Sequence, residues 1–300
     1  MGPMQTRRHY NGLKTILLFV GIIAVLAGVG WILSQSTGDL TWIVVFSLIG
    51  LVTTAISYWN SDKVAIRAMK AQPVSPNQAP ELHRMVSELA AAYRMPTPRL
   101  YVANTEAPNA FATGRNPKNS AVCVTTGILQ VLDARELRGV LAHELSHVAN
   151  RDILTGSVAA ALANVVTTAA NVLAFGSLYG GRSVGRNPLA VIVAAFAAPL
   201  AAMVIRMAIS RTREYDADAD GALLTQDPLG LASALLKLEA AAQQLPMRPT
   251  RRLEPVSHLM IANPFGPLAG GQLFASHPPI EQRVERLHGM AVDLGQVPPA

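Results

Sequence analysis

The sequence predicts a mostly α-helical membrane protein with four transmembrane helices and an α+β domain that contains a small sheet. Half of the 300 residues are hydrophobic and only 15% are charged. The apolar residues gather in four uncharged runs, and a helix needs roughly 20 such residues to cross the hydrocarbon core of a bilayer. Between the runs, apolar residues recur with helical or strand periods. These two patterns together indicate the fold class.

The uncharged runs define the expected membrane plan. A helix in a soluble core would be shorter and would alternate with polar positions. The last two runs are rich in Ala, Val and Thr, and small residues allow close helix packing in lipid. The first run follows a basic segment, as in a signal peptide, but it exceeds the usual apolar core of about 7–15 residues and a second run follows almost at once. We expect two membrane hairpins, the first uncleaved, with the runs Thr15–Gly38, Leu40–Ser61, Ile153–Gly181 and Asn187–Ile205.

Basic residues near the ends of the runs predict the orientation, because Lys and Arg are enriched in cytoplasmic loops. They precede the first run and follow the second, whereas the connection Ser34–Leu40 contains none. Only Arg182 and Arg186, between the third and fourth runs, oppose this plan. The N-terminus and the polar segments are therefore expected in the cytoplasm. The supporting residues are Arg7, Arg8, Lys14, Lys63, Arg67, Lys70, Arg206, Arg211 and Arg213.

The polar segments are expected to form one catalytic domain in two halves. Apolar residues at helical spacing predict a helix over 81–94, and β-branched runs predict strands at 99–103, 110–113 and 121–125. Further helices should begin near Asp133, at the acidic run after the fourth apolar run, near Asp227 and after Pro279. The Pro- and Gly-rich stretch Gln243–Gly271 should be a loop, either a lid or disordered. The predicted parts are 1–61 (first hairpin), 62–152 (first half), 153–205 (second hairpin) and 206–300 (second half).

The strongest chemical signal is His-Glu-x-x-His within Val140–Asn150, an apolar and helix-forming stretch. His143 and His147 are four positions apart, so on a helix both imidazoles project from one face and can bind one divalent metal. Glu144 is placed to take a proton from metal-bound water. The alternative is a chance match of two ordinary surface histidines.

A catalytic zinc ion usually takes three protein ligands, so one more residue is needed. Glu214 and Asp218 are also four apart, in an acidic run that follows a long apolar segment of a basic chain. One carboxylate can ligate the metal, and the other can accept the spare N–H of a zinc-bound histidine and fix its tautomer. From spacing alone either residue could be the ligand, and an acidic, solvated helix start is the plainer alternative.

Four motifs, in this order, resemble those of the HtpX-type membrane zinc metalloproteases, relatives of the CAAX prenyl endopeptidases. They are Asn109–Gly114, His143–His147, Arg213–Asp218 and Ser276–Arg283. The resemblance covers about residues 80–290 and the membrane plan, and it implies a zincin-like catalytic domain. It assigns Glu214 to the metal and Asp218 to a position behind the ligands. It also implies that His277 and Arg283 approach the oxyanion and that Asn109 lines the substrate cleft.

Some of these residues have plainer explanations. His277 precedes two prolines and could cap the last helix, and Arg283 could pair with Glu281 or Glu285. Cys123 is the only cysteine, which excludes an intramolecular disulfide and fits a reducing compartment. Its β-branched surroundings predict a buried small thiol in a strand rather than a nucleophile.

The resemblance also implies the function: one Zn²⁺ per chain and an endopeptidase at the cytoplasmic face of a prokaryotic plasma membrane. Its substrates would be misfolded membrane proteins. Its partners would be the lipid bilayer and an ATP-dependent membrane protease, with which it would share a task in the stress response and in protein quality control. The alternatives are a catalytically silent scaffold or chaperone, which intact Glu144 disfavours, and a zinc transporter, which would need ionisable ligands inside the uncharged runs. The net charge of +6 fits anionic lipid beside the runs. No motif predicts nucleic-acid binding.

Overall fold

The computed structural model describes residues 11–153, 211–248, 250, 253, 257, 259–265 and 278–297. These residues belong to two compact units. One unit holds the helices α1 and α2, and the other holds the described residues of 61–153 and those from 211 onward. The predicted fourth apolar run and all but the first residue of the third lie outside the described residues, as does His277. The predicted domain boundaries therefore stay predictions.

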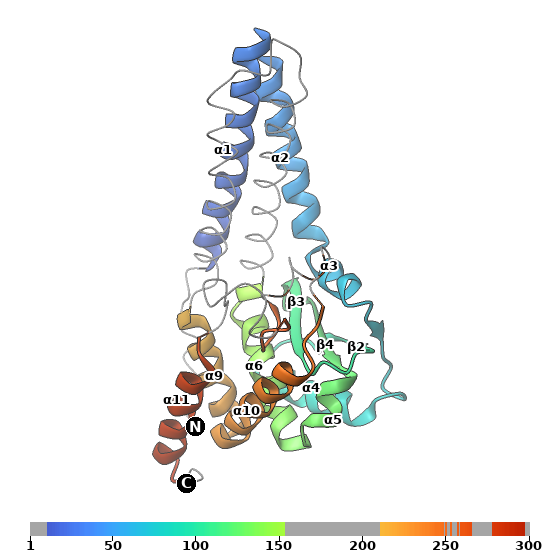
Figure 1. The fold of residues 1–300 in the computed structure, drawn as a ribbon, viewed down its shortest axis with the longest axis vertical. Helices are drawn as coiled ribbons and strands as arrows, with labels where there is room; N and C mark the ends of the chain where they lie inside the picture. Colours follow the sequence, from blue (N-terminus) through green and yellow to red (C-terminus); the bar gives the residue numbers. More distant parts are fainter. Residues whose placement is uncertain are drawn as a thin grey trace. The chain divides into compact units, whose positions relative to one another are not determined.

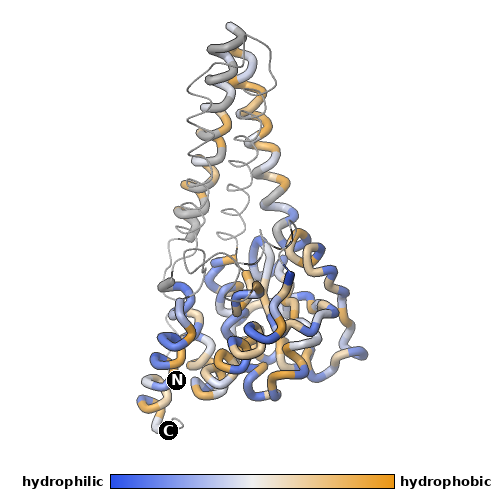
Figure 2. Tube along the Cα trace, viewed as in Figure 1, coloured by the Kyte–Doolittle hydropathy of each residue, from blue (hydrophilic) through white to orange (hydrophobic). Residues whose placement is uncertain are grey.

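The first unit is a pair of long helices, α1 (Asn11–Thr37) and α2 (Thr41–Trp59), which run side by side (Figure 1). A β-carbon added to Gly30 would lie 2.5 Å from the Trp42 carbonyl oxygen, so this close approach requires glycine. Hydrophobic residues follow α2 along most of its length (Figure 2). In the described part of the chain, no helix is both long and apolar enough to cross a membrane. The membrane spans stay predictions, although helices form where the first two were expected.

The second unit is built on a four-stranded sheet with the strand order β1-β2-β4-β3. The central pair β2–β4 is parallel, while β1–β2 and β3–β4 are antiparallel. Gly114 has φ +142°, and a β-carbon there would lie 2.3 Å from the Asn119 carbonyl oxygen, which explains a glycine at the irregularity of the β3–β4 hairpin. The three predicted strands are confirmed, with β3 and β4 longer than expected. The strands are β1 (Gln72–Pro73), β2 (Arg99–Ala103), β3 (Ala110–Asn116) and β4 (Asn119–Thr125).

The two faces of the sheet have different neighbours, because successive side chains of a strand point to opposite faces. Leu100 and Val122 belong to the larger core cluster, which includes residues of α4 (Pro80–Ala92), α6 (Ala134–Ala149) and α10 (Pro228–Gln244). Phe111 and Cys123 belong to a smaller cluster with residues of α3 (Ser61–Ala68) and with Met247. Burial raises the pKa of the Cys123 thiol to about 12. The prediction of a buried structural thiol is confirmed.

The helices of this unit begin where the sequence supplies caps. The Asp133 side chain accepts the Glu136 amide at 2.8 Å, and the Glu136 side chain accepts the Asp133 amide at 3.0 Å, a capping box at the start of α6. Asp227 likewise accepts the Gly230 amide at the start of α10. The predicted helices are confirmed, while α3, α5 and β1 were not predicted. The helices are α3 (Ser61–Ala68), α4 (Pro80–Ala92), α5 (Thr126–Val131), α6 (Ala134–Ala149), α9 (Arg211–Thr225), α10 (Pro228–Gln244) and α11 (Ile280–Asp293).

Two glycines let α6 approach its neighbours closely. A β-carbon added to Gly221 of α9 would lie 2.9 Å from the backbone nitrogen of His143. One added to Gly139 of α6 would lie 3.1 Å from the Leu231 backbone of α10. Because no side chain separates the backbones at Gly221, the acidic residues of α9 come within reach of the histidines of α6.

Candidate active site

The helices α6 and α9 bring together three predicted metal ligands. His143, His147 and Glu214 each offer a ligand atom, and these atoms all lie within 4.8 Å of one another. His143 Nε2 is 3.7 Å from Glu214 Oε2, and His147 Nε2 is 3.5 Å from Glu214 Oε1. A tetrahedral zinc ion with bonds of about 2.0–2.1 Å holds its ligand atoms roughly 3.3 Å apart. The three side chains therefore fit one metal ion after small adjustments.

Each imidazole is held from behind by a carboxylate. His143 Nδ1 lies 2.9 Å from Asp218 Oδ1, and His147 Nδ1 lies 3.1 Å from Asp152 Oδ2. With Nδ1 donating to these oxygens, each Nε2 presents its lone pair toward Glu214, the orientation that metal ligation requires. Asp218 thus makes the contact with an imidazole that was expected of it, and its role in orienting the ligand stays a prediction.

Asp152 was not predicted, although it lies only five positions after His147. It falls beyond the end of α6, where helical spacing no longer tells which side chains meet. Arg151, which has φ +59°, turns the backbone so that Asp152 returns to the imidazole. The only sequence signal was an acidic residue shortly after the motif.

A buried arginine lies behind each carboxylate. Arg283 of α11 donates two hydrogen bonds to Asp218, from Nε at 2.8 Å and from Nη2 at 2.7 Å. Arg213 of α9 donates from Nη1 to the Asp152 carbonyl oxygen at 3.4 Å, and its Nε lies 3.8 Å from Asp152 Oδ1. Burial raises the pKa of Asp218, but the charge and hydrogen bonds of Arg283 outweigh this effect and lower it to about 2.

These contacts divide the site into two halves. The His143 half consists of His143, Asp218 and Arg283, and the His147 half consists of His147, Asp152 and Arg213. Glu214 lies between them and faces both Nε2 atoms.

The buried charges of the site favour a divalent cation. Four carboxylates and two guanidinium groups are buried here, and when all are ionised they leave a net charge of −2. Uncompensated charge in the interior is costly, and one divalent ion would balance it. The six groups are Glu144, Asp152, Arg213, Glu214, Asp218 and Arg283.

Glu144 connects the metal-binding helix to the sheet. Its side chain is buried, and its Oε2 accepts the backbone N–H of Ala112 at 2.9 Å. Ala112 belongs to β3, the outermost strand next to β4. Burial raises the pKa of the Glu144 carboxyl to about 8, and the charge of Glu214 contributes to this shift. A carboxylate next to the metal ligands can accept a proton, as a general base must.

Comparison with known proteins identifies the family. A sequence profile described as Peptidase family M48 matches residues 76–291, which include every residue of this site. The chain belongs to peptidase family M48. It is 58% identical over 288 residues to "Protease HtpX homolog" of Kineococcus radiotolerans, which covers 95% of this chain and 98% of that relative. It is 56% identical over 285 residues to the protein of the same name in Paenarthrobacter aurescens, with coverage of 95% and 98%.

The crystal structure of S. mikatae Ste24p shares the M48 fold seen here. The TM-score is 0.52 at 18% sequence identity, and the match covers 93% of this chain and 65% of that one. At this identity the likeness concerns the fold alone.

Family membership settles the enzyme class and the cofactor. M48 proteins are zinc-dependent metallopeptidases, so this protein is a metallopeptidase whose cofactor is Zn²⁺. Two imidazoles and one carboxylate are a donor set that zinc takes in catalytic sites, where a further position stays open. The predicted resemblance, enzyme class and cofactor are confirmed.

Two further predicted M48 site residues have contacts that the sequence did not indicate. Arg283, expected near the oxyanion, is held by Asp218, and its Nη1 has no hydrogen-bond partner within the described ranges. Asn109 is buried before β3, where its Oδ1 accepts the Ala110 amide and its Nδ2 donates to the Ala262 carbonyl oxygen, both at 3.0 Å. The roles of both residues toward a substrate stay predictions, as does that of His277.

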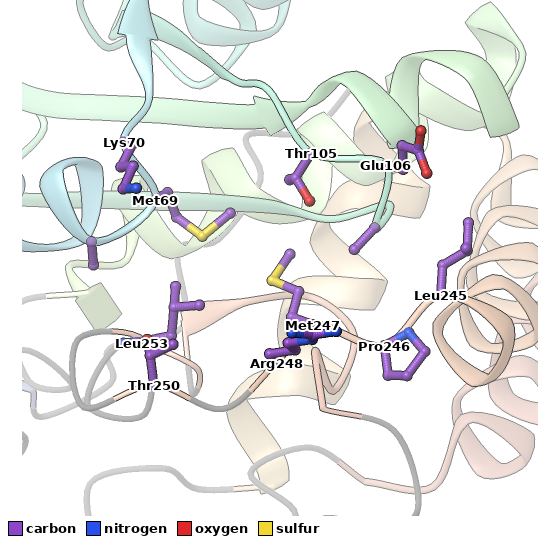
Figure 3. A pocket seen from close by; sticks show the side chains of 12 residues that line it. Met69, Lys70, Thr105, Glu106, Leu245, Pro246, Met247, Arg248, Thr250 and Leu253 are labelled. Atoms are coloured by element: carbon purple, nitrogen blue, oxygen red, sulfur yellow. Dashed lines mark hydrogen bonds between the residues drawn. The ribbon is translucent and has the colours of Figure 1, made fainter.

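A cavity of about 820 Å³ in the same unit is separate from this site (Figure 3). The side chains of Met69 and Met247 approach each other across it, and Lys70, Glu106 and Arg248 add charged groups. No residue of the metal centre lines it. The chemistry of the M48 site is therefore not located in this cavity.

Proposed function

We propose that this metallopeptidase is an integral membrane endopeptidase that cleaves membrane or membrane-proximal proteins at the cytoplasmic face. The observation that carries the endopeptidase part of the proposal is the contact of Glu144, which follows the first metal-binding histidine, with the outer strand β3. This position is where a general base would meet both an activated water and an extended substrate. A silent scaffold would have no need for a carboxylate held in this way.

Zinc, when bound, polarises a scissile carbonyl and lowers the pKa of a coordinated water to roughly 7. His143, His147 and Glu214 would hold the ion. Glu144 would accept the proton of the attacking water and pass it to the leaving amine. The Ala112 N–H holds the Glu144 carboxylate beside β3, and an extended substrate would lie next to this carboxylate. By family resemblance, His277 and Arg283 would stabilise the oxyanion and Asn109 would line the cleft.

The membrane part of the proposal is supported by the exposed apolar side chains of α1 and α2. Exposed apolar patches of this extent are typical of surfaces that meet lipid or another protein. By resemblance, the substrates would be misfolded membrane proteins, and the enzyme would act in quality control beside an ATP-dependent membrane protease. The exposed apolar residues are Ile16, Leu17, Val20, Val44, Leu48, Ile49, Leu51, Val52 and Ile56.

Proteolysis by the full chain in proteoliposomes tests the proposal. The substrates would be casein and a co-reconstituted single-span membrane protein with a destabilised cytoplasmic domain. We expect cleavage of both by the wild type, loss of cleavage in Glu144→Gln or after chelation, and recovery when zinc is added back to the wild type. Cleavage of casein with no cleavage of the membrane protein would remove the proposed substrate class while leaving the peptidase intact.

The cytoplasmic orientation is tested separately with reporter fusions. A reporter after Lys70 should lie in the cytoplasm, and one within Ser34–Leu40 on the opposite side, because that connection lacks Lys and Arg. An enzyme reporter that is active only outside the cytoplasm would distinguish the two positions. Activity of such a reporter after Lys70 would overturn the cytoplasmic face.

A further inference from the structure

Arg213 is the buried first residue of the motif Arg213–Asp218, in which roles have been given above only to Glu214 and Asp218. It lies in the first turn of α9 and is 6% exposed. Its Nε and Nη2 atoms are buried and have no hydrogen-bond partner among the residues that the structure describes. Burying a guanidinium group is costly unless its partners compensate. This cost directs attention to the groups that Arg213 contacts.

The neighbour of Arg213 is the residue that orients one metal ligand. Asp152 Oδ2 lies 3.1 Å from His147 Nδ1, and the other oxygen, Oδ1, faces Arg213 Nε at 3.8 Å. The Asp152 carbonyl oxygen also accepts from Arg213 Nη1 at 3.4 Å. Arg213 thus lies within hydrogen-bond distance of the Asp152 backbone and within ion-pair distance of the Asp152 side chain that holds the imidazole.

We propose that Arg213 is a positioning residue of the metal centre: it fixes Asp152, which orients His147 toward the ion. Arg213 immediately precedes Glu214, so the same helical turn also carries the third ligand. The contact joins positions 61 apart in the sequence. It therefore sets the distance between the end of α6 and the start of α9, from which His147 and Glu214 reach the same ion.

The electrostatic and the orienting effects of Arg213 have opposite signs. A positive charge repels a nearby cation, so if Arg213 acted through its charge alone, its removal would strengthen zinc binding. If Arg213 acts by orienting Asp152, its removal should weaken zinc binding, and changes behind a metal ligand usually cost about 10–100-fold in affinity. The direction of the change in zinc affinity therefore distinguishes the two roles.

A purely structural role gives a third pattern. Arg213 would then hold α9 against the end of α6 without influencing the imidazole. Its substitution would lower the unfolding temperature, while the folded protein would bind zinc as tightly as the wild type and keep the same metal geometry.

The test is zinc affinity of the purified full chain in detergent, measured by competition with a chromophoric chelator. The variants are Arg213→Gln, Arg213→Lys, Asp152→Asn and the double variant Arg213→Gln/Asp152→Asn. Arg286→Gln is the matched control, because Arg286 is an exposed arginine that stacks on the Tyr215 ring at 4.2 Å and does not contact Asp152. Cobalt absorption spectra of each variant report the metal geometry independently of proteolysis.

We expect Arg213→Gln to weaken zinc binding about 10-fold or more and to change the cobalt spectrum, with partial recovery in Arg213→Lys. The double variant should bind zinc about as weakly as Asp152→Asn alone, because the two residues act through one contact. Arg286→Gln should match the wild type. Should Arg213→Gln fail to fold, Arg213→Lys keeps the charge, and the proposal requires it to bind zinc more weakly than Arg286→Gln.

Three results would overturn the proposal. They are unchanged or tighter zinc binding in folded Arg213→Gln, wild-type affinity in Arg213→Lys when Arg213→Gln does not fold, and fully additive losses in the double variant. None of these measurements depends on the substrate or the membrane location, so the proposal can fail while the proposed function stands.

Discussion

The two halves of the metal centre differ in how firmly their histidines are held. In the His143 half, the imidazole is 1% exposed, and Arg283 binds Asp218 through two hydrogen bonds of 2.7 and 2.8 Å. In the His147 half, the imidazole is 13% exposed, and Arg213 contacts Asp152 at 3.4 and 3.8 Å. Paired, short hydrogen bonds between guanidinium and carboxylate groups are stronger and more directional than single, longer contacts.

The difference follows from where the residues lie in the fold. The His143 half is assembled from helices that pack on the same core, since Gly221 brings α9 against the His143 backbone and Leu287 of α11 is fully buried. The His147 half is assembled where the chain leaves α6 and returns at α9. His143 is thus fixed by helix packing, and His147 by the contact between Asp152, just after α6, and Arg213, in the first turn of α9. We infer that the His143 half is the more rigidly held and that the His147 half, which Arg213 holds through longer contacts, has more freedom to adjust.

The largest effect is expected on the rate of proteolysis, from a substitution that leaves both halves of the metal centre intact and removes only the general base. Glu144→Gln should lower proteolysis by at least about 10²–10⁴-fold, because the amide cannot accept a proton from water. Zinc content should equal that of the wild type, as measured by mass spectrometry of the metal. If this variant digests casein at the wild-type rate, Glu144 is not the general base.

The next largest effect is expected on the free energy of unfolding, when Arg283 and Arg213 are substituted in turn. Arg283→Gln should lower the free energy of unfolding by about 3–5 kcal/mol, because it leaves the buried Asp218 carboxylate without its partner. Arg213→Gln should cost clearly less, since its contacts to Asp152 are longer. Unfolding of both variants would be followed by circular dichroism in denaturant without zinc. Equal losses of unfolding free energy in the two variants would show that the two histidines are held equally rigidly.

A smaller contrast is expected in zinc affinity. Asp218→Asn and Asp152→Asn each keep the three ligands but disturb the hydrogen bond to one imidazole, which usually costs about 10–100-fold. The loss should be greater for Asp218→Asn, because the fixed half has less freedom to compensate. Chelator competition gives both affinities. A greater loss in Asp152→Asn would reverse the assignment of the fixed and adjustable halves.

The sequence predicted the parts of the site that depend on local spacing. His143 and His147 share a helix face, as do Glu214 and Asp218, so the structure brought these four residues together as expected. The caps at Asp133 and Asp227 likewise located two helix starts. In each case the relevant partner lies within four positions, and helical geometry alone fixes the contact.

The parts that depend on tertiary approach could not be predicted in this way. Asp152 reaches His147 only because the backbone turns at Arg151, and Arg213 reaches Asp152 only because α9 lies against α6. The partner of Arg283 was misjudged for the same reason: Glu281 and Glu285 are near in sequence, but the side chain reaches Asp218, 65 positions away. The short elements β1 and α3 contain too few residues for a period to be recognised.

The most direct test of the central claim, that His143, His147 and Glu214 hold the catalytic zinc, is the zinc-to-protein ratio of single variants. It would be measured after purification in buffer without added metal. We expect about one zinc per chain in the wild type and in Glu144→Gln, and little or none in His143→Ala, His147→Ala and Glu214→Gln, because two remaining ligands cannot hold the ion tightly. Full zinc occupancy in Glu214→Gln, together with its loss in Asp218→Asn, would contradict the account and exchange the roles of the two carboxylates.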